Sequence, residues 1–343
     1  MPQSEPRWWY ADARSPESLL LAPLGWIYGA AWRARFATTP PMRSERPVIC
    51  IGNFTAGGAG KTPLTIAVAA ILRSLGREPW TLSRGYGGAL AGPVRVDPAR
   101  HGAADVGDEP LLLARNAAAI VSRDRRAGAR FIAENAPANA VIVMDDGLQN
   151  PALRKDLTLV IVDRARGLGN GSVIPAGPLR APLGFQVGLA DALVVNGPLV
   201  LPMRADVAAL AKTIAGPTLS VWPIPADDQS KWRGRRVIAY AGIANPQRFF
   251  SLLENLGAHV VETRAFRDHQ PLTNSEAQNL LAESRAKNAT LVTTEKDMAR
   301  FTGAEGAVAD LAQASEMLRI RLQFGPGDEA TLKTLIARAI QTR

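Results

Sequence analysis

The chain has 343 residues, of which 47% are hydrophobic and 21% are charged, so it can bury a large core, and its length favours two domains. Its formal net charge of +9 favours an anionic partner, which could be nucleic acid, a phosphorylated substrate or an acidic membrane surface. The basic runs at 123–126 and 233–236 are too short and too poor in aromatic residues for a nucleic-acid-binding module, so we expect no nucleic-acid partner.

The N-terminal segment is apolar and rich in aromatic residues. Residues 19–32 are uncharged but fall short of the ~20 apolar residues that a membrane-spanning helix needs, so we do not expect the segment to span. Trp and Tyr favour the headgroup region, and Arg33 and Arg35 follow directly, so residues 1–40 are predicted as an amphipathic, membrane-associating helix. An ordinary core helix is the alternative, and this stretch alone does not separate the two.

A phosphate-binding loop is the strongest motif. The apolar run 48–51 leads into GNFTAGGAGKTP, and a helix-prone run, 64–75, leaves it, which is the strand, loop and helix context of the pattern G-x-x-x-x-G-K-[ST]. The leading glycine is absent, but the remaining glycines let backbone N–H groups turn towards phosphate oxygens. A glycine-rich turn that binds nothing is the alternative. The predicted nucleotide-binding residues are Thr55, Gly57, Gly58, Ala59, Gly60, Lys61 and Thr62.

Two further segments follow in chain order. Residues 80–82 are predicted as a strand that runs into a glycine-rich turn with Arg84 and Tyr86 at its tip. Ligands bind beyond the carboxyl ends of strands in open α/β sheets, so this turn is a candidate ligand-binding loop. The sequence GDEP then begins a helix, for which Asp108 is the expected N-cap.

Asp145 and Asp146 follow the apolar run VIVM at the end of a predicted strand. Downstream of a phosphate loop, this is where a Walker-B carboxylate holds Mg²⁺ directly or through water. Adjacent side chains on an extended chain point in opposite directions, so we expect one carboxylate to bind metal and the other to lie behind it or face the substrate. The alternative is a strand-end turn without metal, and the sequence does not say which carboxylate binds.

The remaining chain alternates strands and helices, which predicts parallel sheets. A long loop at 164–185, rich in Gly and Pro, is expected to be functional rather than disordered. We predict a nucleotide-binding domain at 41–200, a linker at 201–235 and a smaller α/β lobe at 236–343. The fold is thus predicted as α/β, with a P-loop NTPase-like parallel sheet covered by helices on both faces, a second α/β lobe and an N-terminal interfacial helix.

His269 stands out among the three histidines. It follows Asp268 in a loop of the second lobe, ahead of a helix that opens with a capping box of Thr273 and Glu276. From the residues alone, a solvated loop histidine is favoured over a catalytic one.

Seven motifs together resemble one family. In chain order they are GNFTAGGAGKTP, LSRGYGG, GDEP, DDGLQ, IPAGPLRA, FRDHQ and TTEKD, and on them the chain resembles the tetraacyldisaccharide 4'-kinases along most of its length. The resemblance implies transfer of the γ-phosphoryl of ATP, with Mg²⁺, to the 4'-hydroxyl of a tetraacylated glucosamine disaccharide 1-phosphate in lipid A biosynthesis. It also implies a peripheral enzyme on the cytoplasmic face of the inner membrane, with no obligate protein partner. The absence of the leading glycine, where this chain has Thr55, is then a feature of the family.

The resemblance also implies roles for individual residues. Asp108 would be the catalytic base or its close partner, paired across the two lobes with His269. One position departs from the family pattern, in which a glutamate commonly follows the Leu-Arg pair: here it is Ala181. If that glutamate helps to hold metal, this chain must use water or another carboxylate. The other implied assignments are the phosphate contact Lys61, the Mg²⁺ ligands Thr62, Asp145 and Asp146, and the substrate or phosphate contacts Arg84, Tyr86 and Arg180.

The competing hypothesis is a membrane-associated P-loop ATPase or GTPase switch. Dimeric ATPases carry a signature lysine before the paired glycines, where this chain has Ala56, and the N-K-x-D guanine signature is absent. Turnover that depends on an acceptor lipid would support the kinase, and acceptor-independent turnover would support the switch.

Overall fold

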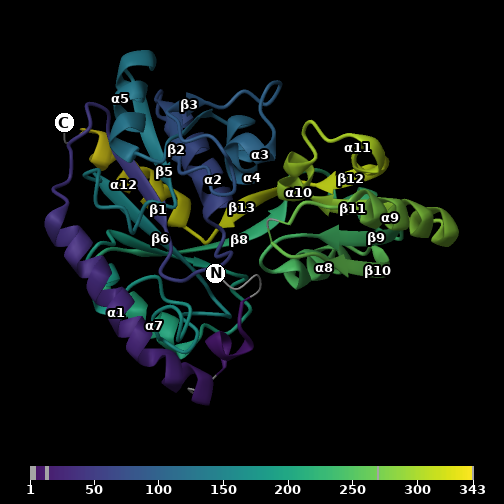
Figure 1. Cartoon of the computed structure of the whole chain (residues 1–343), viewed down its shortest axis with the longest axis horizontal. Coiled ribbons are helices and arrows are strands. Elements are labelled where there is room, and N and C mark those ends of the chain that lie inside the picture. Colours follow the sequence, from purple (N-terminus) through teal and green to yellow (C-terminus); the bar gives the residue numbers. More distant parts are fainter. Residues whose placement is uncertain (1–4, 12–14, 269, 342–343) are drawn as a thin grey trace.

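The computed structural model describes residues 5–11, 15–268 and 270–341, and within these ranges the chain forms two β-sheets (Figure 1). The larger sheet has nine strands in the order β13 (Ile320–Phe324), β8 (Thr218–Pro225), β7 (Ala192–Asn196), β6 (Leu157–Asp163), β1 (Val48–Gly52), β5 (Ala140–Asp145), β2 (Glu78–Ser83), β4 (Ala118–Val121) and β3 (Val94–Arg95). Neighbouring strands are parallel except at the two edges, where β13 pairs with β8 and β3 with β4 in antiparallel fashion.

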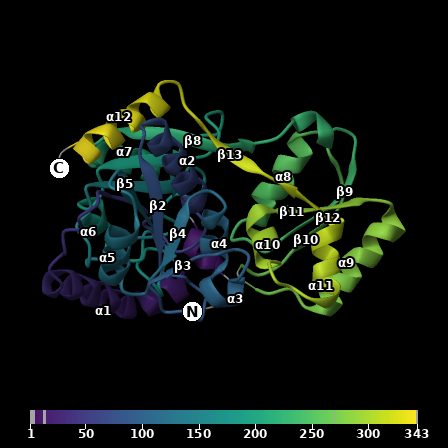
Figure 2. The ribbon, with the colours of Figure 1, turned by 90° about the horizontal axis from the view of Figure 1, so that it is seen from above.

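Helices cover both faces of this sheet, which Figure 2 shows from above. The predicted α/β class, with a largely parallel sheet flanked by helices, is therefore confirmed. The helices of this lobe are η1 (Arg7–Tyr10), α1 (Pro16–Thr38), α2 (Lys61–Ser74), α3 (Ala103–Val106), α4 (Asp108–Ala114), α5 (Arg125–Asn135), α6 (Leu183–Val187), α7 (Ala205–Thr213) and α12 (Asp328–Gln341).

Strand β6 shows why these strands are apolar without alternation. Leu159 and Ile161 pack into one buried cluster with residues of α2 and α12. Val160 and Val162 point to the opposite face and pack with residues of α7. Because both faces of a parallel sheet are covered, both sets of side chains are buried, and the strand is a continuous hydrophobic run.

The second lobe is a four-stranded parallel sheet with its own helices. The predicted capping box is present, since Thr273 accepts a hydrogen bond from the backbone N–H of Glu276 and the Glu276 side chain accepts one from that of Thr273. The elements of this lobe are η2 (Gln229–Trp232), β9 (Arg236–Ala241), α8 (Pro246–Asn255), β10 (His259–Ala265), α9 (Asn274–Lys287), β11 (Thr290–Thr294), α10 (Glu295–Arg300), α11 (Gly306–Ala314) and β12 (Ser315–Leu318).

The expected boundaries of the second lobe differ from the observed ones at both ends. Strand β8 lies within the expected linker but belongs to the larger sheet. Strand β13 was expected in the second lobe but pairs with β8 in the larger sheet, and α12, also expected in the second lobe, packs against β6 and β8. The reason is burial: Leu322, Leu332 and Ile336 carry the apolar faces of β13 and α12 into the same cluster as α2. We therefore propose residues 229–318, from η2 to β12, as the second lobe.

Helix α1 carries its bulky apolar side chains on the outside. Its buried residues are small, namely Ser18, Gly25 and Gly29, and a Cβ on Gly25 would lie 2.8 Å from the carbonyl oxygen of Val173. This is not the arrangement of an ordinary core helix, which buries its large residues. No helix in the described ranges is long and apolar enough to cross a membrane. The large side chains that α1 exposes are Leu19, Leu20, Leu24, Trp26 and Ile27, at 57%, 81%, 53%, 75% and 67%.

Candidate active site

The phosphate loop joins the end of β1 to the start of α2. Gly57 and Gly60 have φ angles of 102° and 100°, in the left-handed region that favours glycine, and α2 begins directly after Gly60. Thr55, at the position of the missing glycine, is extended and forms an antiparallel bridge with Leu179. A β-branched residue suits that extended conformation, which gives a physical reason for the departure from the common motif.

The loop at 164–185 packs along the phosphate loop. The backbone N–H of Ala56 donates to the carbonyl of Pro178 at 2.7 Å, and that of Arg180 donates to the carbonyl of Phe54 at 2.9 Å. The Arg180 side chain donates from Nε to the Thr55 carbonyl at 3.0 Å. The long loop is thus ordered against the site.

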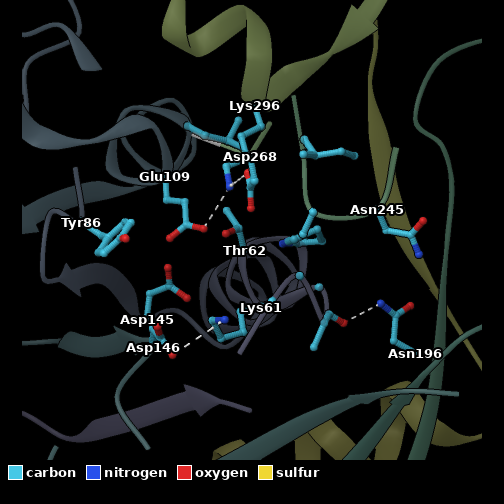
Figure 3. Close-up of a pocket in the computed structure, with 18 of the residues that line it drawn as sticks. Lys61, Thr62, Tyr86, Glu109, Asp145, Asp146, Asn196, Asn245, Asp268 and Lys296 are labelled. Carbon is cyan, nitrogen blue, oxygen red and sulfur yellow. Dashed lines mark hydrogen bonds and ion pairs between the residues drawn. The ribbon is translucent and has the colours of Figure 1, made fainter. Parts of the chain in front are cut away.

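Lys61 is the first residue of α2 and points back across the loop. Its side chain is 9% exposed, and its Nζ lies 3.3 Å from Oδ1 of Asn53 and 3.8 Å from Oδ1 of Asp146. Figure 3 shows this ammonium beside Asp146. At a helix N-terminus, such a lysine adds its charge to backbone N–H groups that already favour an anion.

Asp145 and Asp146 contact different groups. Asp145 is the last residue of β5, is 1% exposed and accepts a hydrogen bond from Thr65 Oγ1 at 3.1 Å. Burial, helped by the nearby Glu109 carboxylate, raises the pKa of Asp145 to about 7. Asp146 has φ 51°, and both of its carboxylate oxygens accept hydrogen bonds from Nη1 of Arg180, at 2.6 and 2.8 Å. Burial would raise the pKa of Asp146, but Arg180 and Lys61 outweigh it and hold that pKa well below its usual range.

These residues fit a Mg²⁺ ion whose coordination shell is completed by phosphate oxygens and water. Within the described ranges, no group of three or more His, Cys, Asp or Glu side chains is arranged to hold a metal alone. Mg²⁺ in nucleotide sites is bound by one or two carboxylates, a hydroxyl, phosphate oxygens and waters. Asp145 offers a buried carboxylate, and a bound cation would offset the cost of burying its charge. Thr62, which follows Lys61 at the start of α2, offers the hydroxyl. Ala181 is fully buried, and its carbonyl accepts a hydrogen bond from Gln186.

We expect Asp145→Asn to stabilise the metal-free protein increasingly as the pH rises. Between the ordinary carboxyl pKa of 3.8 and the folded pKa of about 7, the folded chain keeps a proton that the unfolded chain has lost. Wild-type stability therefore falls through this window, whereas asparagine carries no such cost. Melting temperatures of both proteins in a chelating buffer, from about pH 4 to above pH 7, would measure the difference.

The matched control is Asp310→Asn, which removes an exposed carboxylate from α11. Its melting temperature relative to the wild type should not follow that pH window. A difference for Asp145→Asn that stays constant from pH 4 to above pH 7 would contradict the prediction.

Asp108 is not the N-cap of α4, contrary to expectation. The helix begins at Asp108 itself, with Gly107 in the cap position and no side-chain cap. The Asp108 carboxylate instead accepts from Nε of Arg300, in the second lobe, at 2.8 Å. The local pattern is misleading here because a tertiary partner holds the side chain. His269 lies outside the described residues, and its neighbour Asp268 lies 3.2 Å from Nζ of Lys296.

A cavity of about 1770 Å³ lies between the lobes and brings most of the predicted residues together (Figure 3). Arg84 and Tyr86 are exposed on its wall, and α1 contributes Trp32 and Arg35. Asp108 does not line it and is 4% exposed. The predicted residues on the wall are Gly57, Gly58, Ala59, Gly60, Lys61, Thr62, Arg84, Tyr86, Asp145, Asp146 and Arg180.

Comparison with known proteins assigns the chain to a family. A family profile described as Tetraacyldisaccharide-1-P 4'-kinase matches residues 17–341. The chain belongs to this kinase family. A protein of Nitrobacter hamburgensis named tetraacyldisaccharide 4'-kinase is 51% identical over 342 residues, which cover 98% of each chain. One of a Methylobacterium species, with the same name, is 48% identical over 339 residues and again covers 98% of each. The resemblance drawn from the seven motifs is confirmed.

The fold is also that of a solved member of the family. A crystal structure of LpxK from Aquifex aeolicus in complex with ATP superimposes with a TM-score of 0.73 and 24% identity, covering 94% of this chain and 99% of that one. As a 4'-kinase family member the chain is an enzyme, a phosphotransferase, and the alternative of a nucleotide-dependent switch is not supported.

Sequence reasoning missed several residues of this kinase that lie at or near the cavity. Asn196, at the end of β7, donates to the carbonyl of Ala59 at 2.8 Å and so supports the phosphate loop. Arg248 of the second lobe donates to Oδ2 of Asp163, at the end of β6, at 2.9 Å. Both Asn196 and Asp163 end parallel strands, and that position was the available signal for them. The sequence around Arg248 carries no such signal, because its partner Asp163 lies in the other lobe.

Proposed function

We propose that the enzyme transfers the γ-phosphoryl of ATP to the 4'-hydroxyl of a tetraacylated glucosamine disaccharide 1-phosphate, a step of lipid A biosynthesis. The observation that carries the proposal is the phosphate loop whose Lys61 faces Asp146 in a cavity between two lobes, in a chain of the 4'-kinase family. Transfer of radiolabel from ATP to the purified disaccharide 1-phosphate tests it. Hydrolysis of ATP at the same rate with and without the acceptor would contradict it.

The chain's own residues position the phosphates. The backbone N–H groups of the phosphate loop and the ammonium of Lys61 would hold the β- and γ-phosphates in line with the acceptor. Thr62 and Asp145 would hold Mg²⁺, which when bound neutralises charge on the phosphate oxygens. Asp146 would keep Arg180 and Lys61 in place through the contacts described above. Arg84 and Tyr86, exposed on the cavity wall, would contact the disaccharide.

Proton removal is assigned to the boundary between the lobes. The 4'-oxygen forms a bond to the γ-phosphorus, the bond from that phosphorus to the bridging oxygen of ADP breaks, and the hydroxyl proton must leave. Asp108, which is buried beside the cavity, would act with His269 as the base or as its close partner. A positioned base contributes typically about 10²- to 10⁴-fold. Asp108 already faces the second lobe, from which His269 would act.

Helix α1 would place the enzyme on the cytoplasmic face of the inner membrane as a peripheral protein. Its exposed leucines, Trp26 and Ile27 form an apolar surface of the kind that marks a membrane interface, and Arg33 and Arg35 lie at its end. Its Trp32 and Arg35 also line the cavity, so a lipid held by α1 would lie beside the catalytic residues.

The double change Leu20→Glu and Trp26→Glu should weaken binding to anionic vesicles by about tenfold or more. Both side chains are exposed, at 81% and 75%, so the fold should tolerate the changes. Burying such a side chain in lipid is worth roughly 1.5–3 kcal/mol, and each 1.4 kcal/mol is about a factor of ten. Co-sedimentation with vesicles measures the effect.

The control is Val200→Glu, which alters an apolar residue that is 91% exposed outside α1. Vesicle binding should be unchanged in this variant. Equal binding of wild type and the α1 double variant would remove the helix from the membrane contact.

A further inference from the structure

The motif TTEKD has no role in the function proposed so far, yet it lies at a contact between the lobes. Thr294 is the N-cap of α10, and α10 packs against α4 of the larger lobe, as Figures 1 and 2 both show. Helix α4 begins with Asp108, so α10 faces the proposed base.

Arg300, the last residue of α10, holds the Asp108 carboxylate with two nitrogens. Its Nε and Nη2 lie 2.8 and 2.7 Å from Oδ2 of Asp108, while Oδ1 accepts the backbone N–H of Glu109 at 3.0 Å. The two side chains are only 8% and 5% exposed. Such a pair, shielded from water and bonded through a planar fork, fixes the orientation of the carboxylate.

Arg300 is itself fixed from the second lobe. Its Nη1 donates to Oδ1 of Asp297 at 2.6 Å and to the carbonyl of Gly242 at 2.5 Å. Asp297 in turn accepts from the hydroxyl of Thr294 at 2.7 Å and from the backbone N–H of Gly242 at 3.1 Å. The guanidinium therefore has one defined position, set by the start of α10 and the end of β9.

Lys296 extends the same contact to the cavity. Its Nζ lies 3.4 Å from Oε1 of Glu109 and 3.2 Å from Oδ1 of Asp268 (Figure 3). The same atom lies 3.8 Å from Oδ2 of Asp108. One turn of helix thus places two cations among carboxylates from both lobes. Apolar residues in place of these charges would often stabilise the contact between α10 and α4 equally well. The buried charged cluster therefore indicates a second role, which is to orient the Asp108 carboxylate.

We propose that Arg300 is a positioning residue of the phosphoryl transfer, which holds Asp108 in the orientation needed for proton removal when the lobes are together. The proposal rests on the assigned role of Asp108. Arg300 acts through the Asp108 carboxylate and makes no contact with the phosphate loop, so its loss should lower kcat without changing the KM for ATP.

Arg300→Ala should lower kcat by about 10²-fold, the size of effect expected when a reacting group is misplaced by about 1 Å. Free guanidinium ion at millimolar concentration should restore part of the loss, because it can fill the same site between Asp108 and Asp297. Combined with Asp108→Asn, the change should cost little more than Asp108→Asn alone, since both act through one carboxylate. Steady-state kinetics with ATP and the purified disaccharide 1-phosphate measure all three.

The matched control is Arg235→Ala, which breaks a two-pronged pair with Glu316 within the second lobe, at 3.1 and 2.6 Å. It should keep a normal kcat and respond to guanidinium no more than the wild type does. If Arg300→Ala fails to fold, Arg300→Lys keeps the charge without the fork and should show a lowered kcat at a near-normal melting temperature.

The outcomes separate this inference from the role of Asp108. If Asp108→Asn lowers kcat strongly while Arg300→Ala and Arg300→Lys do not, the inference is wrong and the role of Asp108 stands. If Asp108→Asn keeps its kcat, the role of Asp108 is wrong and the inference falls with it. If losses add fully in the double variant and guanidinium restores nothing, Arg300 only joins the lobes, and the inference is again wrong.

Discussion

Lys61→Ala should lower phosphoryl transfer by about 10³-fold or more and leave the fold intact. The ammonium lies at the N-terminus of α2, next to Asp146 and within the cavity, where charge on transferring phosphate oxygens is stabilised. Removing one preorganised donor from such a site costs about 10²- to 10³-fold, and here a full positive charge is lost as well. Initial rates at saturating ATP and Mg²⁺ measure the loss, and thermal unfolding checks the fold.

The control for this prediction is Lys212→Ala, which removes an exposed lysine from α7. The overall charge changes by the same amount in both variants, so any loss specific to Lys61 reflects its place in the site. Near-normal turnover of Lys61→Ala would overturn the assignment of the phosphate loop.

The second large effect is expected from Asp108→Ala and His269→Ala, each of which should lower kcat by about 10²- to 10⁴-fold with little change in the KM for ATP. If the two act as a unit, the double variant should lose far less than the sum of the two free-energy penalties. Asp108 is 4% exposed and held by Arg300, so its truncation is also expected to lower the melting temperature.

Asp108→Asn, which keeps the shape of the side chain, separates chemistry from folding in this cycle. Additive losses for Asp108 and His269 would mean independent roles, with Asp108 holding the lobes together and His269 binding substrate. A normal kcat for His269→Ala would remove it from proton transfer.

The parts of the site that depend on local chain geometry were predictable. Left-handed glycines such as Gly60 and a lysine at a helix start are encoded within a few residues, and so is a carboxylate at a strand end such as Asp145. The apolar strands were predictable for a similar reason, because burial on both faces leaves a continuous hydrophobic run.

The parts that depend on distant partners were not predictable. Asp108 carries the pattern of an N-cap, but its partner is Arg300, far along the chain. Strand β13 and helix α12 follow the second lobe in sequence, yet the apolar surface that accepts Leu322 and Ile336 lies on the larger sheet. Periodicity says that such an element is amphipathic, without saying which sheet it covers.

Strands β8 and β13 pair in antiparallel fashion, like the two strands of a β-hairpin, and the second lobe is inserted between them. Pro225 lies opposite Ile320, and the backbone N–H of Ala226 donates to the carbonyl of Arg319, so the chain leaves and re-enters the larger lobe at adjacent points. Inserted domains are tolerated where both connections are close together. The residues of the inserted lobe can therefore diverge in sequence without disturbing the nine-stranded sheet. A short turn that joins β8 directly to β13 would leave the fold of the larger lobe complete.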